Sequence, residues 1–150
     1  MSRDLSRRYG LKAKYHYASG FLEKENLYIF KKCASIIIEK WYCNKSGVLR
    51  CESTNKNGMK TGKERSYYNS GNLETEAVCI DGLKEGKKFL YYNSGSLEGE
   101  FNFAKGEKNG IQRYFYRNGI PTREERYASD LCVSVTVLYN NDGSYLDYAV

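Results

Sequence analysis

The chain has 150 residues, with 24 lysines and arginines against 18 aspartates and glutamates, and a formal net charge of +6. This length allows one domain with a modest hydrophobic core. His16 is the only histidine, and the five cysteines form no Cys-x-x-Cys pair, which argues against a zinc site and against histidine-dependent nucleophilic catalysis. Because no glycine-rich phosphate or dinucleotide motif is present either, we expect a protein that is not an enzyme and has no cofactor.

The sequence lacks the apolar segments used for export or membrane insertion. Met1–Arg8 contains no apolar run, and no segment approaches the ~20 apolar residues that cross a bilayer. The five scattered cysteines are Cys33, Cys43, Cys51, Cys79 and Cys132. An odd number of dispersed cysteines is typical of free thiols in a reducing compartment, so we expect a cytoplasmic protein.

Six glycines recur at intervals of 27, 24, 24, 24 and 24 residues: Gly20, Gly47, Gly71, Gly95, Gly119 and Gly143. A fixed period of this length indicates one supersecondary unit copied in tandem. The intervening segments are short, alternate in polarity or end in aromatic residues, and show no helical stripe, so each unit is predicted to be a β-hairpin. The predicted fold is all-β: an elongated antiparallel meander that lengthens by roughly 10 Å with each repeat.

Residues 9–57 are predicted to form degenerate N-terminal repeats. Their apolar strands lie around Leu27–Phe30 and Ile36–Tyr42. Lys31 and Ser35 stand where the later repeats have the two glycines of a Gly-x-x-x-Gly loop. Altered terminal repeats are expected in such an array, because an uncapped sheet end would pair with another chain.

Residues 58–119 contain the regular repeats. Longer strands are predicted at Leu73–Ile80 and Leu97–Ala104, and they alternate with shorter strands that end in aromatic pairs. The shorter strands are Lys63–Tyr68, Lys87–Tyr92 and Ile111–Tyr116. Gly58-x-x-x-Gly62 and its copies 24 and 48 residues later are predicted to form wide, sharply bent loops.

Residues 120–150 are predicted to form the C-terminal capping repeat. It contains an apolar strand at Leu131–Tyr139, and Asp130 and Ser134 replace the loop glycines. All repeats together form a single domain, residues 1–150.

The repeat frame resembles that of a known family. Gly-Lys-x-x-x-Tyr-Tyr-x-x-Gly-x-Leu-x-x-Glu, closed by Asp-Gly-x-x-x-Gly, is similar to the MORN-repeat variant found widely in bacteria. The resemblance covers about Tyr9 to Tyr148 and is strongest from Gly58 to Gly119. It implies a non-catalytic scaffold that binds proteins or, in some eukaryotic members, acidic lipids. One bacterial branch is described as antitoxin or immunity proteins that neutralise a toxin.

The repeated aromatic pairs are the first candidate for a binding surface. They form two columns, Tyr67/Tyr91/Phe115 and Tyr68/Tyr92/Tyr116. Adjacent strand residues point to opposite faces, so one column is expected to pack and the other to be available for a partner. Covering neighbouring apolar residues is the alternative role for both columns.

Two charged columns accompany the aromatic residues. Lys60, Lys84 and Lys108 recur at 24 residues and are predicted to line one long edge. That edge could attract an acidic partner or simply keep the sheet soluble and unpaired. Glutamates such as Glu74 and Glu76 lie at i, i+2, so we expect them to share a strand face and to be satisfied by neighbouring lysines or arginines.

These observations lead to one leading functional hypothesis and two alternatives. The leading hypothesis is a protein-binding scaffold, with an antitoxin or immunity protein as the form that the resemblance implies. The predicted partner-binding residues are Tyr67, Tyr68, Tyr91, Tyr92, Phe115 and Tyr116, with Lys60, Lys84 and Lys108 at the rim. The alternatives are a module that binds acidic lipid or another polyanion through the lysine edge, and an architectural protein that self-assembles end to end. Nucleic acid is a less favoured partner, because no nucleic-acid-binding module is recognisable.

Overall fold

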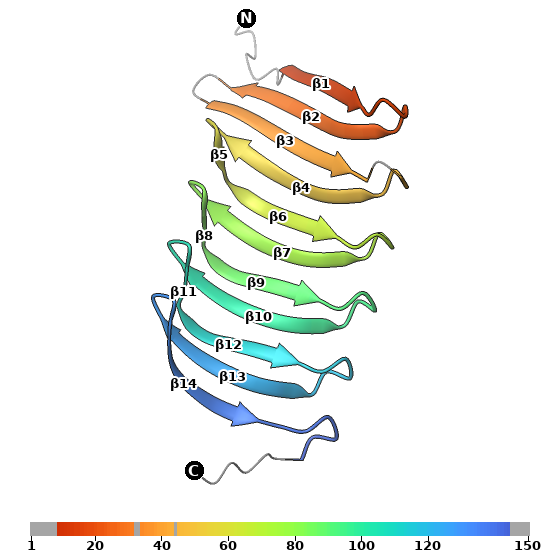
Figure 1. The fold of residues 1–150 in the computed structure, drawn as a ribbon. Helices are drawn as coiled ribbons and strands as arrows, with labels where there is room; N and C mark the ends of the chain where they lie inside the picture. Colours follow the sequence, from red (N-terminus) through yellow and green to blue (C-terminus); the bar gives the residue numbers. More distant parts are fainter. Residues whose placement is uncertain (1–8, 32–33, 44, 145–150) are drawn as a thin grey trace, which may run out of the picture.

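Fourteen strands form one open antiparallel sheet in the computed structural model, which describes residues 9–31, 34–43 and 45–144 (Figure 1). The strands are β1 (Tyr9–His16), β2 (Leu22–Lys31), β3 (Ala34–Tyr42), β4 (Leu49–Lys56), β5 (Met59–Lys60), β6 (Gly62–Tyr67), β7 (Leu73–Ile80), β8 (Leu83–Lys84), β9 (Gly86–Tyr91), β10 (Leu97–Ala104), β11 (Glu107–Lys108), β12 (Gly110–Phe115), β13 (Pro121–Ala128) and β14 (Leu131–Leu138). The main path runs β1-β2-β3-β4-β6-β7-β9-β10-β12-β13-β14, so neighbours in sequence are neighbours in the sheet. The predicted all-β meander of hairpin repeats is confirmed.

The strand boundaries follow the sequence pattern closely. The predicted strands Leu73–Ile80 and Leu97–Ala104 coincide with β7 and β10. The shorter strands β6, β9 and β12 each begin and end one residue before the predicted limits. The second aromatic residue of each pair therefore belongs to the turn and not to the strand.

The prediction of wide glycine loops is wrong. Asn57 and Gly58 both have positive φ, 51° and 82°, as in a two-residue type I′ turn. The chain then pairs back immediately as the short strand β5, and β8 and β11 repeat this arrangement. In the last repeat Ser129 and Asp130 adopt φ of 48° and 63°, so Asp130 occupies the glycine position of this turn.

A bend follows each short strand. Asn55 pairs with Lys60 and Glu52 with Arg65, so four residues of the β5–β6 segment face two residues of β4. Gly62, with φ of 76°, lies within this irregularity, where positive φ is compatible with glycine. The short strands consequently form a separate column along one long edge of the sheet (Figure 1).

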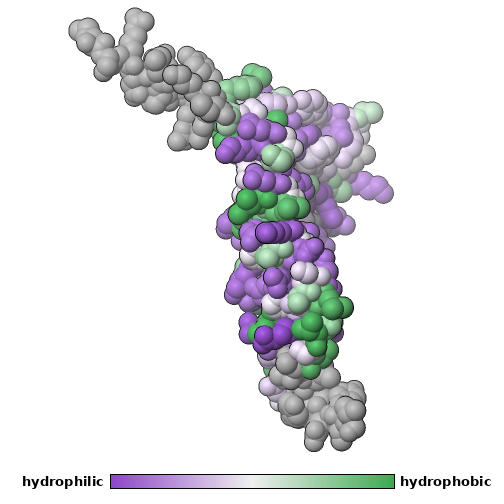
Figure 2. Space-filling view, turned by 90° about the vertical axis from the view of Figure 1, so that its left-hand side faces the viewer, coloured by the Kyte–Doolittle hydropathy of each residue, from purple (hydrophilic) through white to green (hydrophobic). Residues whose placement is uncertain are grey.

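The sheet is a single layer, and its two faces differ. Viewed along the edge that carries the short strands, the molecule is a narrow column with scattered apolar patches (Figure 2). Ala77, Cys79 and Phe101 are the buried apolar residues among those described, and they share one face, which we call the packed face. The opposite face carries a row of ion pairs and is called the charged face.

Gln112 lies beneath the packed face and is fully buried. Its Oε1 accepts a hydrogen bond from the Asn102 amide at 2.9 Å, and its Nε2 donates to the Asn102 carbonyl at 3.0 Å. At this point β10 and β12 are separated by the bend, so the side-chain amide takes the place of a backbone partner. Buried Phe101 covers Gly99, where a Cβ atom would overlap its ring.

The two terminal strands differ in how they limit further pairing. β1 carries Lys12 and Lys14, and charged side chains on an edge strand oppose edge-to-edge association. β14 is apolar, but its register with β13 shifts twice, and such bulges also interrupt pairing.

Candidate functional site

A row of alternating charges crosses the charged face from β1 to β13. The strand register places one residue of each main strand in this row, which we call the charge ladder. Its members are Lys14, Glu25, Lys40, Glu52, Arg65, Glu76, Phe89, Glu100, Arg113 and Glu124. Opposite charges directly across neighbouring strands stabilise a sheet, which explains why acidic and basic residues alternate.

Arg65 shows how the ladder is held together. Its guanidinium lies 3.1 Å from the Glu52 carboxylate and 2.6 Å from that of Glu76. The hydrogen bond from Arg65 lowers the pKa of Glu76 and outweighs the effect of partial burial. Arg113 bridges two carboxylates in the same way, at 3.7 Å from Glu100 and 2.5 Å from Glu124.

Phe89 interrupts the ladder at the centre of the sheet. It occupies the position of Arg65 and Arg113 in the neighbouring repeats, 24 residues away on either side. Each of the two adjacent carboxylates has an arginine on its other side and also pairs with a lysine further along the strands, Glu76 with Lys63 at 3.2 Å and Glu100 with Lys87 at 2.6 Å. An aromatic ring is therefore placed among ion pairs, with the Tyr91 ring centroid 6.4 Å from its own.

An aromatic row runs beside the ladder on the same face. It consists of Tyr42, Tyr67, Tyr91 and Phe115, each paired across strands with a leucine or proline: Leu49, Leu73, Leu97 and Pro121. All eight residues are half-buried. The Tyr67 hydroxyl donates to Glu52 at 2.9 Å, which joins the row to the ladder. The column Tyr67/Tyr91/Phe115 thus lies on an open face and retains exposed ring surface.

The second aromatic column has a structural role. The hydroxyl of Tyr68 donates to the Tyr91 carbonyl at 2.7 Å, and that of Tyr92 donates to the Phe115 carbonyl at 2.8 Å. Tyr116 repeats the contact with Tyr139 at 3.3 Å. Each hydroxyl links one repeat to the backbone of the next, which gives this column a packing role.

The lysines of the predicted basic edge lie in the short strands: Lys60 in β5, Lys84 in β8 and Lys108 in β11. The Lys84 ammonium lies 5.6 Å from the centre of the Phe103 ring, and that of Lys108 lies 4.8 Å from the Tyr127 ring. Lys60 forms an ion pair with Glu64. All three side chains therefore have partners within the sheet, and Lys84 and Lys108 are only partly exposed.

The prediction that Glu74 and Glu76 share a face is wrong. Ser66 contacts Glu74, at 3.1 Å, whereas the adjacent residue Arg65 contacts Glu76. Adjacent strand residues point to opposite faces, so the two carboxylates are separated. The cause is a register shift between Leu73 and Thr75, which places one extra residue in β7.

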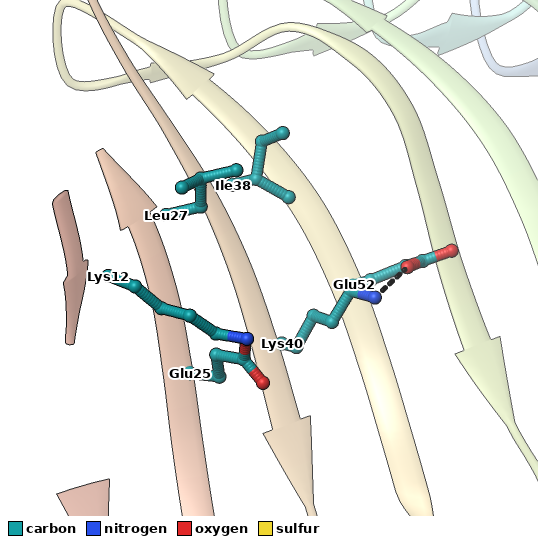
Figure 3. A pocket seen from close by; sticks show the side chains of 6 residues that line it. All are labelled: Lys12, Glu25, Leu27, Ile38, Lys40 and Glu52. Carbon is teal, nitrogen blue, oxygen red and sulfur yellow. Dashed lines mark ion pairs between the residues drawn. The ribbon is translucent and has the colours of Figure 1, made fainter. Parts of the chain in front are cut away.

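A hollow of about 530 Å³ opens on the charged face over β1–β4 (Figure 3). Leu27 and Ile38 lie beside each other on one side, while Lys12 reaches toward Glu25 and Lys40 toward Glu52 (Figure 3). Sequence reasoning missed this site because the N-terminal repeats depart from the regular frame. The available signal was that Glu25 and Leu27 are two residues apart, so that a charged and an apolar side chain share one face of β2.

No catalytic or metal-binding arrangement stands out among the described residues. His16 ends β1 opposite Leu22. No group of three histidine, cysteine or acidic residues that could hold a metal occurs in residues 9–31, 34–43 and 45–144. The same residues include no helix able to span a membrane.

Comparison with known proteins gives no family assignment. No protein-family model matches the chain, and no curated protein matches it significantly.

Proposed function

We propose that the chain is a non-catalytic protein-binding scaffold whose contact surface is the charged face. The observation that carries the proposal is the half-buried aromatic row, with Tyr67, Tyr91 and Phe115 beside the charge ladder on a single-layer sheet. Aromatic side chains surrounded by polar groups are the usual energetic centres of protein interfaces. The ladder supplies the charged rim around them.

The repetition of the site supports binding over catalysis. An active site needs one special environment that shifts pKa values, whereas Glu52, Glu76 and Glu100 have similar ion-paired surroundings in successive repeats. A row of equivalent groups suits an extended contact with a macromolecule.

The repeat frame makes a toxin the first partner to test, because one bacterial branch of the MORN variant that it resembles is described as antitoxin or immunity proteins. Cys43, Cys51, Cys79 and Cys132 are all free thiols. Free thiols support a reducing compartment such as the cytoplasm.

The experiment compares aromatic-to-alanine changes on opposite faces, two on the charged face and one on the packed face. The purified protein is used to capture partners from a lysate of the organism that encodes it, and captured proteins are identified and measured by titration calorimetry. Tyr91→Ala together with Phe115→Ala should weaken binding by about 2 kcal/mol or more. Tyr15→Ala, at a 46 % exposed tyrosine on the packed face of β1, is the control and should leave affinity unchanged.

Capture of no protein, or equal losses in both variants, would count against this surface as the binding site.

Self-assembly is a second candidate, favoured by the exposed edge strand β14. Leu131, Val133 and Val135 are 68, 51 and 54 % exposed. Although the bulges between β13 and β14 oppose regular pairing, an apolar edge strand can pair with another copy of the chain. Light scattering that gives the monomer mass at all concentrations would remove this candidate.

The lysine edge remains the basis of a third candidate, a module for acidic lipid or another polyanion. Its support is the column formed by Lys60, Lys84 and Lys108 in the short strands. Changing all three to glutamate should abolish sedimentation with acidic liposomes. Unchanged sedimentation would exclude the edge as the membrane contact.

A further inference from the structure

The hollow over β1–β4 continues into a second, smaller one. The larger, of about 530 Å³, is lined by Lys12, Glu25, Leu27, Ile38, Lys40 and Glu52. The smaller, of about 180 Å³, also contacts Ile38 and Glu52 and extends to Lys63 and Arg65. Because they share two residues, the hollows form one groove along the N-terminal half of the charge ladder. Leu27 and Ile38 give one side of the larger hollow an apolar surface (Figure 3).

The ion pairs along this groove are uneven in exposure. The Lys12 side chain is 56 % exposed but its partner Glu25 only 17 %. The Lys63 side chain is 59 % exposed against 21 % for Glu76. The Lys40 side chain is likewise more exposed than that of its partner Glu52. The carboxylates thus lie low on the sheet, while the ammonium groups extend toward solvent and keep hydrogen-bonding capacity for another anion.

We propose that this groove binds an acidic segment of a partner protein that places an apolar side chain against Leu27 and Ile38. The inference rests on the proposed scaffold function and identifies the chemistry of the partner. Carboxylates on either side of the apolar residue meet the outward ammonium groups of Lys12 and Lys40. Charge complementarity of this kind, together with the net charge of +6, accelerates association and selects against basic partners.

A protein segment fits the groove better than an anionic membrane surface. The apolar surface of Leu27 and Ile38 lies on one side of the hollow and the two ion pairs on the other, so a single side chain can enter where a flat bilayer cannot.

The test uses a short fluorescein-labelled peptide in which glutamates flank a central leucine, measured by fluorescence anisotropy. Lys12→Gln combined with Lys40→Gln should weaken peptide binding by about tenfold or more, because two charged contacts are lost. Lys45→Gln combined with Lys105→Gln removes the same charge at exposed turns and is the matched control, expected to change affinity by less than about threefold.

Two further arms probe the apolar contact and the alternative ligand. Ile38→Thr, or replacement of the peptide's leucine by glycine, should also weaken binding. In the last arm, vesicles of phosphatidylglycerol and phosphatidylcholine replace the peptide. They should bind the wild-type protein no more tightly than they bind the control variant.

Absence of peptide binding, equal losses in the two lysine pairs, or binding to vesicles but not to peptide would each overturn the inference. The proposed function has a separate readout. A captured partner that is lost in the Tyr91→Ala and Phe115→Ala variant, but kept in the Lys12→Gln and Lys40→Gln variant, would preserve the scaffold and reject only the groove.

Discussion

Replacing Gln112 tests whether its side chain supplies the hydrogen bonds that the backbone of β10 lacks where it is separated from β12. In Gln112→Met the volume is kept but the acceptor for the Asn102 amide is lost, and an unpaired buried N–H costs about 1–3 kcal/mol. The Asn102 carbonyl keeps a second donor, the Asn109 amide at 2.9 Å, and the other bond lost is the longer one from Gln112 Nε2 to the Gly110 carbonyl, at 3.3 Å. Gln112→Ala also removes one buried methylene group at about 0.8 kcal/mol, which gives a total loss of about 2–4 kcal/mol.

Urea unfolding followed by far-ultraviolet circular dichroism measures both losses, and an unchanged m-value keeps the comparison valid. Lys88→Met is the matched control, because Lys88 occupies the same position one repeat earlier and is only half-buried. Burial, followed by the nearby charges of Lys84 and Lys108, lowers the pKa of Lys88, so an apolar replacement there should cost little. A Gln112→Met protein within about 0.5 kcal/mol of the wild type would refute the proposed backbone role.

Three further predictions concern other parts of the sheet. Tyr92→Phe removes the hydroxyl that donates to the Phe115 carbonyl and should lower the free energy of unfolding by about 1 kcal/mol in the same urea assay; no change would show that the contact does not stabilise the array. The pKa of Glu76 is lowered in the folded protein, so its ion pair stabilises the fold above the unfolded-state pKa of about 4.3 and this contribution disappears as the pH falls through the lower folded value. The difference in thermal unfolding temperature between wild type and Glu76→Gln should therefore shrink as the pH falls below about 4.3, and a constant difference would contradict the assignment. The pKa of the Cys43 thiol is lowered by hydrogen bonds from Ser46 and from the turn backbone, whereas burial raises that of Cys79, so iodoacetamide should label Cys43 before Cys79 in the native protein, as read by peptide mass spectrometry.

The glycine period and the alternation of residue types are enough to determine the fold from the sequence alone. A repeat of 24 residues with strand-like segments leaves few options beyond tandem hairpins, and β7 and β10 have the predicted limits. The same local reasoning anticipated that neighbouring strands would satisfy the glutamates, as Arg65 does for Glu76. These features depend on interactions between residues close in sequence or one repeat apart.

Only the tertiary structure decided where side chains lie once the register shifts. One extra residue in β7 reverses the face of Glu74, and a single-residue change of register has no signature in an alternating sequence. The structure also assigned the two aromatic columns, because the Tyr68 hydroxyl finds its acceptor on Tyr91, a full repeat away. The groove at Leu27 and Ile38 needed the structure for a similar reason: it forms between β2 and β3 in repeats whose sequences do not match the regular frame.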